Sequence, residues 1–191
     1  MAHLSILGTG NMGAAIAGVA GRGGHTVQLL GSGDVETALT GDIVVLAVPY
    51  PALKAVIAQR QNQLDGKVVV DITNPLNFET FDSLVVAPDS SAAAEIAAAL
   101  PQSRVLKAFN TTFAGTLAAG TVGSLPTTVL IAGDDADAKA ELGGIVTSGG
   151  LKAVDAGSLA RARELEALGF LQLTLAANEK VSWTGGFAVV A

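Results

Sequence analysis

Hydrophobic residues in this chain gather in short continuous runs, which alternate with longer segments of helical spacing. Each run ends in a polar, proline or glycine turn. Continuous apolar runs are typical of strands in a parallel sheet that is covered on both faces. The pattern therefore predicts an α/β fold, doubly wound, with a mostly parallel sheet. The predicted strands are residues 4–7, 26–30, 42–48, 67–72, 104–108, 127–132 and 151–154.

The segments between these runs predict helices that cover the sheet. Small apolar residues follow the first strand, and glycines at 21, 23 and 24 end that helical pattern. About a dozen residues separate the second and third strands, so the crossover helix expected there is short. Asp135 is predicted to cap a helix through its side-chain oxygen. The further helices are expected at about 35–39, 52–59, 91–100, 136–146 and 159–179, and residues 77–90 are expected to form a surface loop.

The last predicted helix has leucines at near-helical spacing, which indicates one apolar face. Its charged residues, among them Glu164 and Glu166, are expected on the other faces, and Gly169 suggests a close contact with another helix. The tail from Trp183 to Val190 is also apolar. We therefore predict that helix and tail contribute to a homodimer, as an extension (about 158–191) of a single domain (1–191). The leucines are Leu159, Leu165, Leu168, Leu171 and Leu175.

Composition narrows the class of protein. The chain has 191 residues and a formal net charge of −6, without a cluster of Lys or Arg, which argues against a nucleic-acid partner. The lack of cysteine excludes disulfides and thiolate ligands, and no set of Asp, Glu and His has metal-ligand spacing. No uncharged apolar run has the length of a membrane span. A cytoplasmic protein without a metal or a membrane partner is expected.

The turn after the first strand carries the main chemical signal. Gly8, Gly10 and Gly13 have the G-x-G-x-x-G spacing between a predicted strand and a predicted helix, which is the context of a Rossmann dinucleotide site. Gly8 would allow the tight turn, Gly10 the approach of a pyrophosphate, and Gly13 close packing of helix on strand. The alternative is a glycine-rich turn in an ordinary α/β domain.

The end of the second strand bears on the choice of cofactor. An acidic residue there would bind an adenine-ribose 2′-hydroxyl, but this chain has Leu30, Gly31 and Ser32. The Ser32 hydroxyl and nearby N–H groups suit a 2′-phosphate, so NADP is favoured over NAD. Asp34 is the alternative ribose ligand.

Loops after the later strands are expected to face the glycine turn over the cofactor. Neither histidine is expected near this edge, so no catalytic acid or base is assigned. Lys107 is predicted to lie at the margin of the sheet, whereas for Asn110 and Asp71 structural and functional roles both stay open. Phe109 and Phe113 either pack in the core or lie against a planar ring.

Six motifs along the chain occur in the order of a known family. They are Gly8-Thr9-Gly10-Asn11-Met12-Gly13, Leu30-Gly31-Ser32, Ala47-Val48-Pro49-Tyr50, Asp71-Ile72-Thr73-Asn74-Pro75-Leu76, Lys107-Ala108-Phe109-Asn110-Thr111 and the segment 155–163. With these motifs the chain resembles the NADP-dependent oxidoreductases that use the deazaflavin coenzyme F420, and their bacterial dinucleotide-binding relatives. The resemblance spans nearly the whole chain and implies that the family's roles fall on matching positions. Gly33 stands where the family commonly has a phosphate-binding arginine.

By this resemblance the pyrophosphate would lie on Thr9, Gly10, Asn11 and Met12, with the 2′-phosphate on Ser32. The ribose and nicotinamide would lie along the loops that hold Ala47, Val48, Pro49, Thr73 and Asn74, with Ala114 beside the nicotinamide amide.

The expected function is hydride transfer between NADPH and a flavin-like or deazaflavin acceptor, which needs two stacked rings and little acid-base chemistry. Two alternatives stay open: an NADP-binding redox sensor without catalysis, and a reductase of small carbonyl compounds that uses Asn110 and water as the acid.

Overall fold

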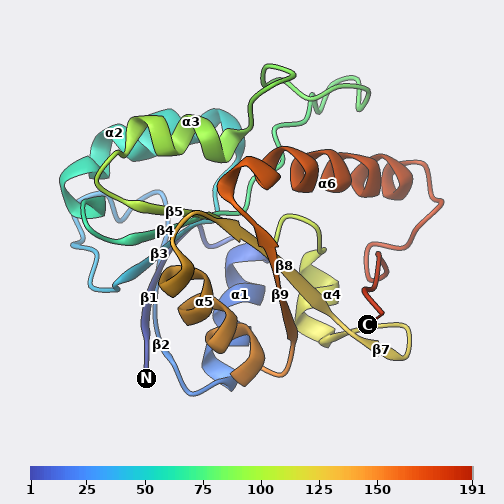
Figure 1. Cartoon of the computed structure of the whole chain (residues 1–191), viewed down its shortest axis with the longest axis horizontal. Helices are drawn as coiled ribbons and strands as arrows, with labels where there is room; N and C mark the ends of the chain where they lie inside the picture. Colours follow the sequence, from blue (N-terminus) through green and yellow to red (C-terminus); the bar gives the residue numbers. More distant parts are fainter. Residues whose placement is uncertain (191) are drawn as a thin grey trace.

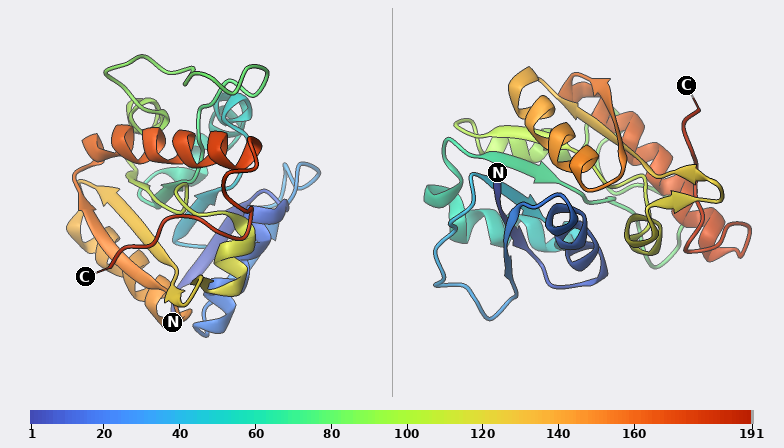
Figure 2. Two further views of the ribbon diagram at one scale, coloured as in Figure 1. Left: turned by 90° about the vertical axis from the view of Figure 1, so that its right-hand side faces the viewer. Right: turned by 90° about the horizontal axis from the view of Figure 1, so that it is seen from below.

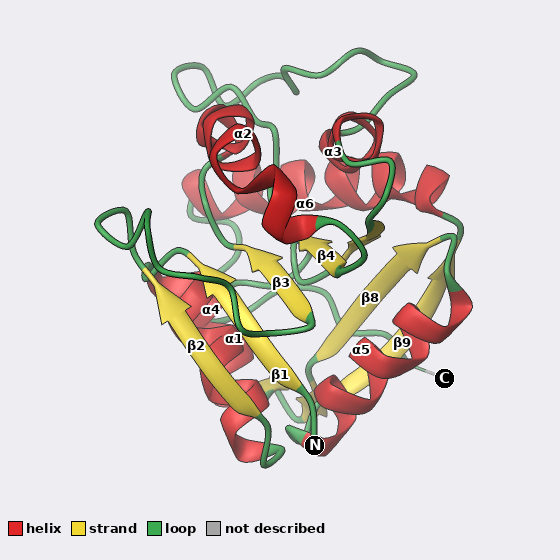
Figure 3. Ribbon diagram, turned by 90° about the vertical axis from the view of Figure 1, so that its left-hand side faces the viewer, coloured by secondary structure: helices red, strands yellow, loops and turns green. Residues whose placement is uncertain are grey.

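A seven-stranded sheet forms the centre of the computed structural model, which describes residues 1–190. Its order is β2-β1-β3-β4-β5-β8-β9 (Figure 3). The first five strands are parallel, and β8 pairs antiparallel with β5 and parallel with β9. The predicted doubly wound, mostly parallel α/β fold is confirmed. The strands are β1 (His3–Leu7), β2 (Thr26–Leu30), β3 (Ile43–Leu46), β4 (Val68–Asp71), β5 (Arg104–Lys107), β8 (Thr128–Gly133) and β9 (Lys152–Gly157).

Helices cover both faces of the sheet, as the continuous apolar strands require. Three helices pack on one face in the larger core, and two pack on the other face in a smaller core (Figure 1). The first group is α1 (Asn11–Arg22), α4 (Ala114–Ala119) and α5 (Ala136–Ser148), and the second is α2 (Leu53–Leu64) and α3 (Ala92–Ala99). The short elements are the 3-10 turns Tyr50–Ala52 and Leu159–Arg161 and the hairpin of β6 (Thr121–Val122) and β7 (Leu125–Pro126).

The predicted helix at 35–39 was wrong, and the segment between β2 and β3 consists of turns. The guanidinium of Arg60, on α2, donates to the carbonyl oxygens of Asp34 and Thr37. Because these carbonyl oxygens already accept hydrogen bonds from Arg60, they do not need the backbone hydrogen bonds of a helix. The sequence pattern also missed α4, which is too short to show a clear period.

Helix α6 (Ala162–Ala177) exists as predicted, but its predicted apolar face is only partly right, since Leu165 is buried and other positions are not as expected. Leu171 is 49% exposed, whereas Glu166 and Gln172 are buried. Gly169 does not face another helix, because a Cβ there would lie 2.3 Å from Oδ1 of Asn74 in the loop after β4. The face that α6 turns inward at Gly169 therefore packs on the loop after β4, not on another helix.

The tail after α6 turns back toward α4 (Figure 2). Thr116 Oγ1 donates to the carbonyl oxygen of Gly185 at 2.7 Å, and the rings of Trp183 and Phe113 have centroids 5.0 Å apart. Part of the tail is thus packed on its own chain, whereas Phe187, Val189 and Val190 are exposed. The homodimer stays a prediction.

Candidate cofactor and acceptor site

The glycine turn lies where β1, β2 and β3 end side by side. The Gly8 N–H donates to the Leu30 carbonyl, and the Ala47 N–H donates to the Leu7 carbonyl, both at 2.8 Å. Gly8 has a φ of +122°, and a Cβ there would lie 2.0 Å from the Ala47 oxygen. A Cβ on Gly13 would lie 1.9 Å from the Gly8 oxygen. Both glycines are therefore required by packing alone.

Gly10 differs from these two glycines, because a Cβ on it would have no atom within 4 Å. Gly10 is the N-cap of α1, and no side chain bonds the first N–H groups of that helix. Its first turn also has no acidic residue. Open space beside free N–H groups at a helix N-terminus fits a bound pyrophosphate.

The loop after β2 packs beside this turn, since a Cβ on Gly31 would lie 3.5 Å from the Thr9 side chain. The Gly31 N–H donates to Oδ2 of Asp34 at 2.7 Å, so this carboxylate helps to shape the loop. Ser32 and Gly33 are exposed. The Ser32 hydroxyl is therefore accessible to a ligand. The carboxylate of Asp34 lies two residues further along the same loop.

The loop after β3 continues the same edge of the sheet. Ala47 packs on Gly8, and Val48 and Pro49 follow it toward Tyr50. The Tyr50 hydroxyl donates to Oε2 of Glu95 on α3 at 2.8 Å. Burial raises the pKa of Tyr50 to about 12, and the Glu95 carboxylate adds to the shift. This contact ties the loop after β3 to α3.

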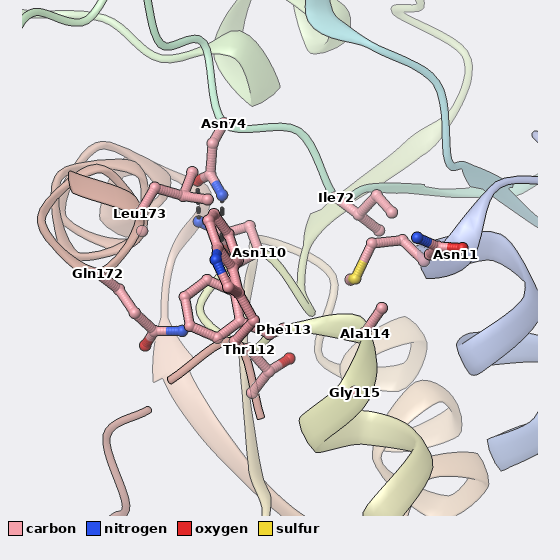
Figure 4. A pocket seen from close by; sticks show the side chains of 13 residues that line it. Asn11, Ile72, Asn74, Asn110, Thr112, Phe113, Ala114, Gly115, Gln172 and Leu173 are labelled. Carbon is pink, nitrogen blue, oxygen red and sulfur yellow. Dashed lines mark hydrogen bonds between the residues drawn. The ribbon is translucent and has the colours of Figure 1, made fainter. Parts of the chain in front are cut away.

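A cleft of about 410 Å³ opens between the N-terminus of α1 and α6. Figure 4 shows Asn11 and Ile72 on one side of it and Gln172 and Leu173 on the other. Of the predicted site residues, Asn11, Met12, Asn74 and Ala114 line it. Other lining residues were given no place in the site by the sequence; for those on α6 and the tail, the only signals were Gly169 and the apolar character of the tail. These residues are Ile72, Thr112, Gly115, Gln172, Leu173 and Trp183.

The remaining predicted residues do not line this cleft. Thr73 is buried, and Thr9, Ser32, Ala47, Val48 and Pro49 belong to the glycine turn and the two loops beside it. The predicted set therefore falls into two groups along one edge of the sheet.

Lys107 was predicted at the sheet margin, and that interpretation was wrong. Its side chain is fully buried, and Nζ donates to Oδ2 of Asp71 at 2.7 Å, Oε1 of Glu166 at 2.7 Å and the Thr73 carbonyl at 2.6 Å. The antiparallel pairing of β8 with β5 places this lysine inside the sheet rather than at its edge. A buried ammonium needs such partners.

The two carboxylates of this network also hold backbone N–H groups. Oδ1 of Asp71 accepts from the Thr73 N–H, and Glu166 accepts from the N–H groups of Ala92 and Ala93 at the start of α3. Burial raises the pKa of the Glu166 carboxyl, and the Lys107 ammonium acts in the opposite direction. Asp71 is thus a structural acceptor that shapes the Thr73 loop.

Asn110 belongs to a hydrogen-bond network and also lines the cleft, so its structural role is observed and its functional role stays a prediction. Its Nδ2 donates to Oδ1 of Asn74 at 2.9 Å and to the Leu165 carbonyl at 2.8 Å, and it lines the cleft. Its Oδ1 is buried without a partner, as are Thr73 Oγ1 and Gln172 Oε1. Two of these oxygens belong to residues that line the cleft, Asn110 and Gln172, so the cleft offers hydrogen-bond acceptors that the protein itself does not use.

The two phenylalanines have different roles. Phe109 lies in the core with a positive φ of +63°, and Phe113 lines the cleft. Neither histidine contributes there, since His25 accepts from the Ala2 N–H and His3 contacts Thr40. Within residues 1–190, no three His, Cys, Asp or Glu side chains come together as a metal site, and no helix is long and apolar enough to cross a membrane.

A family model and curated relatives both match this chain, and they agree on one family. Residues 27–75 match the family model described as NADP oxidoreductase coenzyme F420-dependent. The chain is 30% identical over 166 residues to the F420-dependent NADP reductase of Methanocaldococcus jannaschii, covering 85% of this chain and 74% of that protein. The chain belongs to the F420-dependent NADP oxidoreductase family. The family model spans β2 to the loop after β4, and thus includes Ser32, the Ala47 loop and Asn74.

Two further relatives agree with membership of the F420-dependent NADP oxidoreductase family. The F420-dependent NADP reductase of Methanothermobacter marburgensis is 30% identical over 167 residues, covering 83% of this chain and 73% of that protein. The crystal structure of a putative F420-dependent NADP-reductase from Arthrobacter has a TM-score of 0.85 at 24% identity, covering 98% of this chain and 99% of that one. This last likeness supports the fold over the full length of the chain.

Proposed function

We propose that this family member transfers a hydride between NADP(H) and a planar flavin-like or deazaflavin acceptor. The observation that carries the proposal is the chemistry of the cleft lining, which contains amides, small residues, aliphatic and aromatic side chains but no ionisable group. Hydride transfer between two ring systems needs close stacking and exclusion of water more than a proton donor. A carbonyl reductase, in contrast, needs an acid at the oxygen.

NADP would lie along the edge of the sheet with its pyrophosphate at the first turn of α1, near Thr9, Gly10 and Asn11. Ser32 would hold the 2′-phosphate, and the loops with Ala47 to Pro49 and with Thr73 and Asn74 would hold the nicotinamide riboside. When bound, the dihydronicotinamide supplies the hydride. Ala114 would meet the nicotinamide amide, which leaves the α6 side of the cleft for the acceptor.

Coenzyme F420 is the first acceptor to test, because both archaeal relatives are named F420-dependent NADP reductases. The assay follows loss of NADPH absorbance with F420, FMN, ferric chelates or small carbonyl compounds. Turnover with F420 or FMN is expected, at a rate that carbonyls do not reach. Tight NADP binding without turnover would instead support a redox sensor, and preferred turnover of carbonyls would support the Asn110-dependent reductase.

We also propose that the protein forms a homodimer through α6 and the tail. Several apolar side chains there are exposed in the single chain: Leu171, Phe187, Val189 and Val190. Contiguous apolar surface on a monomer commonly marks an interface, and these side chains belong to one helix and the tail that follows it. Light scattering at micromolar concentration should give twice the chain mass of 19.0 kDa. A monomeric mass would refute the dimer and leave the enzymatic proposal intact.

A further inference from the structure

The C-terminal tail brings a distant part of the chain to the cleft. Trp183 comes five residues after the C-cap of α6, Asn178, yet it lines the same cleft as Met12 at the start of α1. It is also the only tryptophan in the chain. The tail is therefore part of the candidate site and not only a surface segment.

Contacts on two helices hold the tail in this place. On α4, Thr116 Oγ1 donates to the Gly185 carbonyl, and a Cβ on Gly115 would lie 3.1 Å from the Thr184 side chain. On α6, a Cβ on Gly186 would lie 3.5 Å from the Gln172 amide. The tail thus crosses from one helix to the other at the outer side of the cleft.

Trp183 packs on one aromatic partner and leaves much of its surface open. Its ring lies 5.0 Å from that of Phe113, with an angle of 55° between the planes. Phe113 is buried, whereas Trp183 is 51% exposed. An indole that is supported on one side and open on another is suited to contact a further flat ring.

We propose that Trp183 is a specificity-determining residue for the hydride acceptor. With Phe113 it forms an aromatic wall that favours planar conjugated acceptors over small carbonyl compounds and metal chelates. Planar rings gain contact area and stacking energy on this wall, and the smaller or rounder molecules do not. The inference rests on the proposed hydride transfer, and it adds the group that selects the acceptor.

The kinetic test compares Trp183→Ala and Trp183→Phe with Phe78→Ala as the matched control. Phe78 is an aromatic residue in the loop between β4 and α3, 56% exposed, that does not line the cleft. For Trp183→Ala we expect the KM for F420 or FMN to rise about 3- to 10-fold, as loss of one aromatic contact implies. The Kd for NADPH should stay within about twofold, Trp183→Phe should recover most of the loss, and Phe78→Ala should match the wild type.

An unchanged acceptor KM in Trp183→Ala would overturn the proposal, as would an equal loss of NADPH affinity, which would mean a general disturbance of the cleft. Thr116→Val tests the tail separately, because it removes the hydrogen bond to Gly185 but does not alter the cleft lining. A smaller rise of KM in the same direction is expected. No rise at all would mean that Trp183 does not depend on this anchor and would contradict the role given to the tail.

A binding test separates this proposal from the proposed function. FMN is titrated into the NADP complex, with emission of the single tryptophan as one readout and calorimetry as the other. Quenching in the wild type and weaker calorimetric binding in Trp183→Ala support the wall even if no acceptor is turned over. Turnover of FMN without quenching, and with equal binding by both proteins, would reject the wall and retain the hydride transfer.

Discussion

The two halves of the proposed site are built by different means. At one end, the glycine turn and the loops after β2 and β3 are shaped by backbone, with Gly8 and Gly13 pressed against carbonyl oxygens. At the other end, the loops after β4 and β5 are held by side chains, through Lys107, Asp71 and Glu166. The shape of the first half therefore requires glycines, because a Cβ would clash with the neighbouring backbone. The second half requires its buried charges to be paired.

This difference predicts what each half tolerates. An exposed side chain beside the glycine turn can change at little cost to stability, whereas an added methyl group at Gly8 cannot be accommodated. In the buried network a change of one charge leaves the others unpaired in the protein interior. Four experiments test this contrast, and they are given from the largest expected effect to the smallest.

Lys107→Met tests the buried half most directly. It leaves the Asp71 and Glu166 carboxylates without their cation, so the free energy of unfolding should fall by about 3–5 kcal/mol. Urea denaturation measures this. The matched control is Lys139→Met, since Lys139 pairs with Asp155 at the same kind of distance, 2.8 Å, but Asp155 is 61% exposed. That loss should stay below about 1 kcal/mol, and similar losses in both variants would contradict the contrast.

Gly8→Ala and Gly10→Ala separate structure from binding within the glycine turn. The first should cost roughly 2–4 kcal/mol of stability, because of its positive φ and the Ala47 oxygen. The second should cost below about 1 kcal/mol, yet it should weaken NADP binding about tenfold, because its methyl group would fill the space proposed for the pyrophosphate. Denaturation and calorimetry check both. Normal NADP affinity in Gly10→Ala would place the pyrophosphate elsewhere.

Ser32→Ala examines the exposed loop of the same half. Its hydroxyl is exposed and makes no hydrogen bond within residues 1–190, so stability should be unchanged, within about 0.5 kcal/mol. The ratio of NADP to NAD affinity should fall about tenfold, as loss of a hydrogen bond to a phosphate implies. Calorimetry with both cofactors measures the ratio. Tighter binding of NAD by the wild type would reject the assignment of Ser32 and favour Asp34 as a ribose ligand.

Tyr50 ties the loop after β3, in the first half, to Glu95 on α3, and its titration gives the smallest effect. It is the only tyrosine, so the ultraviolet absorbance of tyrosinate reports its ionisation alone. The midpoint should lie near a pKa of about 12, above the ordinary 10.0. Because the folded pKa is raised, the contribution of this hydroxyl to stability is present below pH 10 and is lost as the pH rises toward 12.

Glu95→Gln is the companion variant for this titration. It removes the negative charge beside the hydroxyl, so the midpoint should move down, but burial, the largest cause of the shift, should keep it above the ordinary value. A wild-type midpoint at the ordinary value would show that the loop after β3 is not tied to α3 in solution.

The sequence by itself determined the features that depend on neighbouring residues. Apolar runs defined the strands, Asp135 capped α5 through the Ala138 N–H as predicted, and the spacing of Gly8, Gly10 and Gly13 marked the turn. These signals are local, because a turn, a cap or a buried strand is specified by a few adjacent side chains.

The tertiary structure alone decided the other half of the site. Lys107 meets Asp71 across 36 positions and Glu166 across 59, and Gly169 is explained only by Asn74. The antiparallel β8 puts that lysine inside the sheet, and the return of the tail brings Trp183 to the cleft. Hydrophobic periodicity records whether a position is buried among apolar groups, but it cannot record which distant charge or loop makes burial of a polar residue favourable.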